Sequence, residues 1–220
     1  MLPGIAPIVP LLGVRKVWLG SGVNNADAGT LSFGNFTVPT GGGLLVALIT
    51  SIGANSRTTS SVSIGGVSGT LHASHGASSL YKAAIASRVV AAGSHNVSLV
   101  LSGNTGTSPR SFCGCWLLTN YLFTTPTFTS CYYGGTGSLS ISRTHDIPVG
   151  AANLYEVTEI SSSSPSWSNA VQDGDATASL GSKAYWASRV GAGPKSGHTE
   201  TATFSSGLGG HLMMNAAVWA

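Results

Sequence analysis

The sequence predicts an all-β protein: a two-sheet antiparallel β-sandwich, jelly-roll-like, with an internal pseudo-repeat and an extended N-terminal arm. Short apolar or alternating runs are separated by Gly, Ser, Asn and Pro, which is typical of a sandwich or barrel made of many short strands. Only 8% of the 220 residues are charged, while 42% are hydrophobic. Helical bundles and coiled coils are rich in Glu, Lys, Arg and Leu, and disordered chains combine low hydrophobicity with high charge. The composition argues against both.

Residues 1–14 are an apolar segment that we expect to form an extended arm. Pro3, Pro7 and Pro10 disfavour a helix there, and the segment is too short to span a bilayer. Its positive charges follow the apolar run, whereas a signal peptide carries them before it. An exposed apolar arm needs a partner surface, either on its own domain or on a neighbouring copy. The candidate contact residues of this assembly arm are Leu2, Ile5, Ile8, Val9, Leu11 and Leu12.

Six runs in the first half are predicted to be strands. The run from Leu44 to Ile49 is continuously apolar, which suits a buried strand. The run from Leu31 to Val38 alternates between apolar and polar residues and stops at a proline. The remaining predicted strands are Ser61–Ile64, Ala83–Val90, Val97–Leu101 and Phe112–Leu118. Three segments rich in Ser, Thr, Gly or Asn are expected to be surface loops: Ile52–Ser60, Gly103–Arg110 and Ser161–Asp175.

The second half of the chain repeats features of the first half in the same order. The sequence Ala-Ser-Arg-Val at 86–89 recurs at 187–190, and each copy precedes a turn that contains Gly. The other matched segments are Gly29–Phe33 with Gly137–Ile141, Val38–Gly42 with Ile147–Ala151, and His95–Leu99 with His198–Ala202. An ordered series of matches indicates internal pseudo-symmetry.

No charged or Pro-rich linker separates the two halves, because residues 117–123 cross the midpoint as a hydrophobic stretch. Domain boundaries usually fall in exposed polar linkers. We therefore expect residues 15–220 to form a single sandwich built of two similar halves, about 15–118 and 119–220, and not two free domains.

The charge pattern argues against nucleic acid as a partner. The ten basic residues are scattered along the chain, and the net charge of +3 reflects a shortage of acids. A nucleic-acid-binding protein concentrates its basic residues in a patch or stripe. A surface that depends on hydroxyls and amides for solubility is unusual for a free monomer. It suits a subunit of a large assembly, so we expect a homo-oligomer with no nucleic-acid and no membrane partner.

The three cysteines are Cys113, Cys115 and Cys131, and an odd number excludes a fully paired set of internal disulfides. Cys113 and Cys115 share one face of a predicted strand, at a spacing beyond that of a normal disulfide. Two interpretations stay open: three reduced thiols in the core, or thiols that cross-link within or between subunits of an extracellular particle. The Cys-x-Cys spacing is too short for a zinc site, and no second pair follows.

The acids, histidines and serines form no recognisable catalytic motif. Glu156 and Glu159 have opposite parity on a strand and are expected on opposite faces, whereas a glycosidase needs two carboxylates close together. The adjacent His145 and Asp146 do not define a triad, which depends on geometry. No Gly-x-Ser-x-Gly nucleophile elbow is present. We expect a protein that is not an enzyme, with no catalytic residue, no metal and no cofactor.

Aromatic residues supply the candidates for ligand contact. Trp116, Trp186 and Trp219 lie in strand-like runs and are expected in the core. Trp167 lies in a Ser-rich segment predicted to be a loop, where an indole can stack on a sugar ring or fold back over the end of a sandwich. Tyr132 and Tyr133, which precede a Gly-Gly pair, are weaker candidates for glycan contact.

Several segments, taken in order, have the character of a known class of protein. They are the opening Met-Leu-Pro-Gly-Ile, the strand that ends in Val-Pro-Thr-Gly-Gly, the buried Leu-Leu-Val-Ala-Leu strand, the later Ala-Gly-Ser-His-Asn-Val-Ser-Leu, and a Cys-Trp-Leu-Leu strand. This pattern resembles small β-sandwich structural proteins of tailed bacteriophages and prophages. The resemblance extends over most of the chain and rests on the general character and order of these segments, not on one sharp motif. The three cysteines are not part of it.

The resemblance implies a virion protein, as a head decoration, collar, or tail-fibre or spike component, and it brings no catalytic residues. Such proteins are made in the host bacterial cytoplasm and leave it by lysis, so they need no secretion signal. Trimers are common among them, and the implied partners are copies of the same chain and other virion proteins. The alternative is a carbohydrate- or receptor-binding module at a tail fibre or spike, with a host-surface glycan as its ligand.

Overall fold

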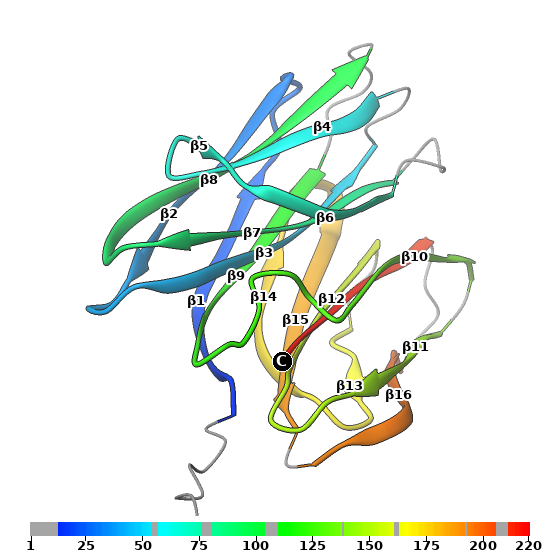
Figure 1. Cartoon of the computed structure of the whole chain (residues 1–220). Coiled ribbons are helices and arrows are strands. Elements are labelled where there is room, and N and C mark those ends of the chain that lie inside the picture. The colour runs from blue at the N-terminus through cyan, green and yellow to red at the C-terminus, as the bar shows by residue number, and fades with distance from the viewer. Residues whose placement is uncertain are drawn as a thin grey trace, which may run out of the picture.

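The chain is described by a computed structural model over residues 13–53, 57–75, 81–103, 110–137, 139–160, 163–191, 193–205 and 211–220. These ranges form 17 β-strands in four sheets, and neighbouring strands within each sheet are antiparallel (Figure 1). The only helix in the described ranges is the short 3-10 turn η1 (Ser179–Gly181). The described residues therefore contain no helix that is long and apolar enough to cross a membrane. The predicted all-β antiparallel sandwich architecture is confirmed.

The first half of the chain builds two of the sheets. The large sheet has the strand order β1-β9-β3-β7-β6, and the small sheet has the order β2-β8-β4-β5. Gly65 and Gly66 have φ values of +63° and +76° and form the tight turn between β4 and β5, a conformation that favours glycine. The strands are β1 (Arg15–Asn24), β2 (Thr30–Val38), β3 (Gly43–Ile52), β4 (Arg57–Ile64), β5 (Val67–Ser68), β6 (Thr70–His75), β7 (Tyr81–Val90), β8 (Gly93–Gly103) and β9 (Arg110–Thr119).

The second half builds the other two sheets. Its large sheet has the order β10-β17-β12-β15-β14, and its small sheet has the order β11-β16-β13. The strands are β10 (Phe128–Thr136), β11 (Ser140–Ile147), β12 (Ala152–Ile160), β13 (Ser166–Trp167), β14 (Val171–Thr177), β15 (Ser182–Val190), β16 (Lys195–Thr203) and β17 (His211–Trp219).

The two large sheets have the same strand order once each strand is matched with its counterpart. In sequence order, β1, β3, β6, β7 and β9 take the places that β10, β12, β14, β15 and β17 take in the other half. The register agrees as well. Val89 of the first Ala-Ser-Arg-Val segment pairs with Leu44 at the start of β3, and Val190 of the second pairs with Ala152 at the start of β12. The repeated segments therefore occupy equivalent places in the two halves.

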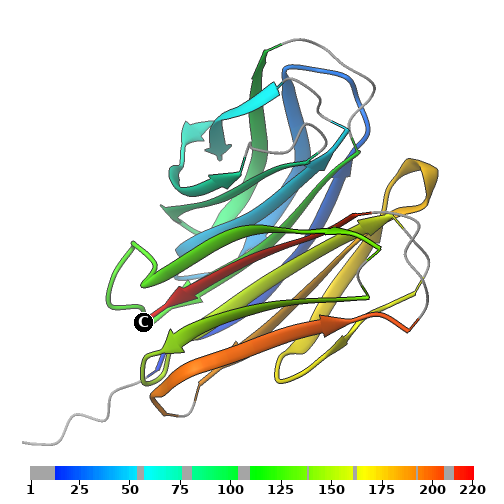
Figure 2. The same cartoon turned by 90° about the vertical axis from the view of Figure 1, so that its right-hand side faces the viewer.

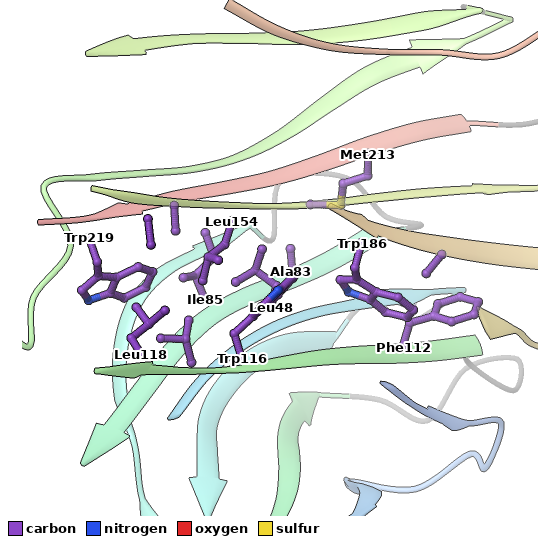
Figure 3. Close-up of a cluster of buried hydrophobic side chains, with 14 of the residues drawn as sticks. Leu48, Ala83, Ile85, Phe112, Trp116, Leu118, Leu154, Trp186, Met213 and Trp219 are labelled. Atoms are coloured by element: carbon purple, nitrogen blue, oxygen red, sulfur yellow. The ribbon is translucent and has the colours of Figure 1, made fainter. Parts of the chain in front are cut away.

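The four sheets are stacked so that the two large sheets face each other in the middle (Figure 2). Each half is a β-sandwich with its own core, and a further core lies between the halves. Trp116, Trp186 and Trp219 are fully buried in this middle core, as predicted (Figure 3). The edge strand β1 lies beside β14, and its counterpart β10 lies beside β6, so the contacts between the halves are approximately reciprocal.

The position of β3 explains its continuous apolar sequence. Leu44, Val46 and Leu48 belong to the core between the halves, whereas the alternate residues from Leu45 to Ile49 belong to the core of the first sandwich. A strand covered on both faces presents no side chain to water, so both faces are apolar.

The sheets number four, whereas one pair was predicted over residues 15–220. The prediction took the apolar midpoint as a sign of a single sandwich. The structure gives another reason for that composition, because the connection between β9 and β10 packs on the folded chain. Tyr121 lies against the core between the halves, and the Leu122 N–H donates a hydrogen bond of 2.8 Å to the carbonyl of Ala220.

Two of the predicted surface loops contain strands. The segment Ser161–Asp175 includes β13 and the first residues of β14, and Ile52–Ser60 includes the start of β4. β14 is an edge strand whose residues are mostly exposed or half-buried, so its sequence is polar like that of a loop. Of the third predicted loop, Gly103 and Arg110 end β8 and begin β9, and residues 104–109 lie outside the described residues.

Candidate functional site

The point where the predicted arm joins the folded chain is fixed by contacts with the second half. The arm residues Leu2, Ile5, Ile8, Val9, Leu11 and Leu12 lie outside the described residues, which begin at Gly13. The Val14 N–H donates a hydrogen bond of 2.8 Å to the carbonyl of Gly150, in the turn between β11 and β12. A Cβ on Gly13 would lie 3.0 Å from the Gly150 Cα, so the two backbones are in close contact. The arm therefore starts from a defined place between the two sandwiches.

Exposed apolar side chains gather around this junction, and we name them the arm-base surface: Val17, Leu122, Val149 and Val190. On one side of Gly13, Val17 and Val190 help to line an open hollow of about 590 Å³. On the other side, Leu122 and Val149 line a much smaller hollow. Leu122 is 65% exposed and Val190 is 43% exposed. Apolar groups gathered at one place on a surface mark an interaction site more often than scattered ones do.

The arm-base surface was not predicted from the sequence. Its residues come from β1, the connection between β9 and β10, the turn before β12, and the end of β15. They lie far apart in the sequence and share no periodicity, and only the fold brings them together. The one available signal is that Val190 closes the second Ala-Ser-Arg-Val segment, just before a turn where a polar residue is more usual.

All three cysteines are free thiols. Cys113 and Cys115 are buried in the core of the first sandwich with their sulfur atoms 3.6 Å apart, so they share a face as predicted. Cys131 is half-buried on β10 and packs against the core between the halves. Burial, with a smaller contribution from Glu156, raises the pKa of the Cys131 thiol to about 12. Since the thiolate is the reactive form, this thiol stays protonated at neutral pH.

Trp167 lies on a strand and not in a loop, because β13 pairs with β16 through Trp167 and Ala202. Its ring is half-buried against the core of the second sandwich, 6.2 Å from the ring of Tyr155. In the first sandwich, the counterpart of Ala202 is Leu99, which pairs with Val62. Val62 therefore corresponds to Trp167, and it is fully buried. Trp167 thus packs against the core of the second sandwich as a partly buried residue.

Tyr132 and Tyr133 point to opposite sides of β10. Tyr132 is 43% exposed, and the guanidinium of Arg143 lies 3.2 Å from its ring centre, a cation–π contact that covers one face of the ring. Tyr133 is half-buried, with its ring 5.5 Å from that of Tyr81 in the first half. The structure does not bring these two tyrosines and Trp167 together on one exposed face.

Glu156 and Glu159 lie on opposite faces of β12, as predicted. Glu156 is fully buried between the halves, and burial raises its pKa to about 8. Glu159 lies on the side of Tyr185, and burial raises its pKa to about 7. Because the sheet separates them, the two carboxyl groups cannot act on one substrate.

The His72–Ser87 pair has the spacing of a catalytic pair, but its counterpart indicates a structural role. His72 Nε2 lies 2.7 Å from Ser87 Oγ, and His72 is the bulged residue of edge strand β6. In the second half, Asp173 is the bulged residue of β14 and accepts a hydrogen bond from Ser188 Oγ. Each bulge thus fixes an edge strand to the serine of its Ala-Ser-Arg-Val segment.

A cluster of ionisable groups is buried inside the second sandwich. His145 Nε2 lies 3.2 Å from Asn153 Oδ1 and 3.1 Å from the Tyr155 hydroxyl. Its ring contacts that of His198 at 5.4 Å, and His198 Nε2 lies 3.4 Å from a carboxylate oxygen of Glu200. The other carboxylate oxygen accepts hydrogen bonds from Ser168 Oγ and from the backbone N–H groups of residues 169 and 170. Among the described residues no group of three or more His, Cys, Asp or Glu side chains has the arrangement of a metal site.

The first sandwich has apolar residues where the second has this cluster. Phe36 pairs with His95, and His145 pairs with His198, so Phe36 is the counterpart of His145. In the aligned segments His95–Leu99 and His198–Ala202, the buried Val97 corresponds to Glu200. Comparison of the two halves could therefore have identified a buried glutamate from the sequence alone. The cluster anchors the segment that carries Trp167, because Glu200 accepts hydrogen bonds from residues 168–170.

We expect the second sandwich to lose stability as the pH falls below about 6.5, the ordinary pKa of histidine. Burial lowers the pKa values of His145 and His198. The unfolded chain therefore binds protons that the folded chain does not, and the free energy of unfolding rises with pH in this range. His145→Phe places at this position the phenylalanine that the first half has at Phe36. This variant should show a weaker dependence of the free energy of unfolding on pH, measured by urea unfolding from pH 7 to pH 5. The matched control is His95→Phe in the first half, and an equal change in both variants would contradict the assignment.

Comparisons with known proteins add little to this description. No protein-family model matches the sequence, and no curated protein matches it. The crystal structure of the PBSX exported protein XepA is similar over 97% of this chain and 89% of that chain, at 14% sequence identity and a TM-score of 0.24. A similarity of this size assigns no function to the chain.

Proposed function

We propose that the protein is a structural component of a bacteriophage particle, without enzymatic activity, that works through contacts with copies of itself and with other particle proteins. The observation that carries the proposal is the arm-base surface, where exposed apolar side chains gather at the origin of an apolar terminal segment. Apolar patches of this kind are sites of protein–protein contact.

The distribution of polar groups supports the same proposal. Only 8% of the residues are charged, which suits a subunit whose surface is covered by neighbours. The ionisable clusters lie inside the sandwiches or between them, where they hold strands and loops in place. In the described residues, the hollows beside the arm base are lined mainly by apolar residues and glycine, together with Asn120 and the charged residues Arg15 and Lys16.

The proposal is tested by the mass of the full-length chain in solution and by its presence in particles. We expect an oligomer by light scattering, and we expect the double variant Leu122→Ser/Val149→Ser to shift the protein toward smaller species at equal concentration. Both side chains are exposed, so the fold should tolerate the change. The matched control is Val67→Ser on β5, which is 50% exposed in the outer sheet of the first sandwich. A wild-type chain that stays monomeric at all concentrations and is absent from purified particles would refute the proposal.

A further inference from the structure

We propose that the hollow beside Val17 and Val190 holds the N-terminal arm, residues 2–12, of a second copy of this chain. This inference rests on the proposed function, and it names the partner of the arm-base surface. It predicts that copies associate by exchanging arms, and not by pressing two flat surfaces together.

The chemistry of the hollow matches that of the arm. The arm contains no charged residue and carries six large aliphatic side chains. The hollow has a volume of about 590 Å³, and Val14, Val17 and Val190 provide apolar walls. Lys16, which also lines it, is held by Asp173 at 3.6 Å and by Ser188 Oγ at 2.5 Å. An apolar segment can therefore enter without separating the Lys16 ammonium group from its partners, and Arg15, the other charged residue of the lining, is exposed to solvent.

The origin of the arm favours a second copy over the same chain. The hollow begins at Gly13 itself, the residue from which the arm departs. A segment with the extended conformation that the sequence predicts would rise about 3.1 Å per residue, and such an arm would leave its own hollow within a few residues of Gly13. To reach it, the arm would have to reverse within a few residues of Gly13. Pro7 and Pro10 each fix φ near the value of an extended, polyproline-like segment, which favours a straight course over these residues. The arm of a neighbour needs no reversal.

The fixed start of the arm makes exchange between copies effective. The hydrogen bond from Val14 to Gly150 and the contact between Gly13 and Gly150 hold the junction in place. Each copy thus presents a donor arm and an acceptor hollow from adjacent positions. Reciprocal exchange closes a two-fold dimer, and head-to-tail exchange closes a ring, as in other domain-swapped assemblies.

A binding experiment tests the hollow directly. The full chain lacking residues 2–12 is titrated into a fluorescently labelled peptide of residues 1–13, and binding is followed by anisotropy. We expect the peptide to bind, and we expect Val190→Asp in the truncated chain to weaken binding at least about tenfold, roughly 1.4 kcal/mol. The matched control is Val67→Asp, at a similarly exposed strand residue far from the hollow in sequence and in the outer sheet. Equal affinity in both variants would overturn the proposal.

A mixing experiment tests for exchange. Full-length Val190→Asp has an arm but a blocked hollow, and the truncated chain has a hollow but no arm. Neither should associate alone, and the mixture should form a one-to-one complex by light scattering. If the mixture forms no complex, the inference is overturned.

The outcomes also separate this inference from the proposed function. If the truncated chain keeps the wild-type oligomer mass, the inference fails while the proposed function stands. If the wild-type chain is monomeric while the peptide still binds the truncated chain, the arm occupies its own hollow and exchange is excluded. A monomeric chain that is also absent from particles fails the proposed function.

Discussion

Replacing Gly114 with alanine is expected to lower the free energy of unfolding by about 1–3 kcal/mol, the range for overpacking in a close-packed core. Gly114 lies in the middle of β9, on the face directed at the other half. A Cβ there would lie 2.2 Å from Nε1 and 2.3 Å from Cδ1 of Trp186. The fully buried indole of Trp186 fills the space above the glycine, so the added methyl group has no room.

The indole cannot move aside without disturbing the core between the halves. Its ring centre lies 5.8 Å from that of Trp18, and Trp18 is in turn 4.8 Å from Trp116. Figure 3 shows Trp186 directed into the cluster, near Phe112. A protein interior is packed as densely as an organic crystal. The strain should therefore be felt by both sandwiches, and unfolding followed by tryptophan fluorescence should show a lower midpoint with an unchanged denaturant slope.

The matched control for this prediction is Gly193→Ala, because no atom lies within 4 Å of a Cβ built at Gly193. A second variant, Gly114→Ala with Trp186→Phe, tests the mechanism, since the smaller ring should accept the methyl group. The double variant should lose less than the sum of the two single losses, which is a coupling energy between residues in contact. Equal losses at residues 114 and 193 would show that the interface has room to relax.

The sequence predicted the architecture best where burial is one-sided or complete. The alternation from Leu31 to Val38 and the apolar run from Leu44 to Ile49 both lie in strands, because in each case the pattern reports which faces are covered. The echo of Ala-Ser-Arg-Val was also informative, since the two copies lie at equivalent places in β7 and β15. Periodicity, however, does not say what covers a face.

That gap explains why one pair of sheets was expected where the structure has two pairs. Leu44 and Leu45 look alike in sequence, yet one belongs to the core between the halves and the other to the first sandwich. The same gap explains the strands that were missed. Edge strands such as β14 have few covered residues, and a polar edge strand has the composition of a loop. Trp167 was assigned to a loop for this reason.

The candidate site could be predicted only in part. The apolar character of residues 1–14 is visible in the sequence, but Val17 of the first half and Val190 of the second meet at its base only because the two halves are stacked. The buried cluster around His145 was also missed, because a histidine or glutamate on a strand is usually exposed. In the alignment of the two halves, Glu200 corresponds to the apolar Val97, and this match already indicated a buried glutamate.

The stacking of the halves also buries a carboxyl group, Glu156, at the centre of the molecule. Its Oε2 atom accepts hydrogen bonds from Thr50 Oγ1 at 3.0 Å and from Asn215 Nδ2 at 2.6 Å. Thr50 belongs to the first half, so this contact joins the two sandwiches. Burial raises the pKa of Glu156 from 4.5 to about 8, although the contacts with Asn215, Thr50 and Trp186 oppose the shift. The folded protein therefore keeps this carboxyl group protonated at neutral pH.

Glu156→Gln is expected to stabilise the protein increasingly as the pH rises. Between pH 4.5 and about 8, folded Glu156 holds a proton that the unfolded chain has released, so the free energy of unfolding of the wild type falls with rising pH. At about 1.36 kcal/mol for each pH unit, the full effect is on the order of 5 kcal/mol. Glutamine has nearly the shape of the protonated acid and does not titrate. The two proteins should therefore have similar stability near pH 4.5 and diverge up to pH 9 in urea unfolding.

Asp146→Asn is the matched control for the alkaline effect. Asp146 is exposed, and its hydrogen bonds with the Gly197 N–H and Ser196 lower the pKa of its carboxyl group. It is therefore ionised in both the folded and the unfolded state from pH 5 to pH 9, and its replacement should shift stability by a constant amount across this range. A Glu156→Gln effect that is equally flat would mean that Glu156 is ionised in the folded protein. The link between the halves would then be a buried carboxylate held by Thr50 and Asn215, and not a neutral hydrogen-bonded acid.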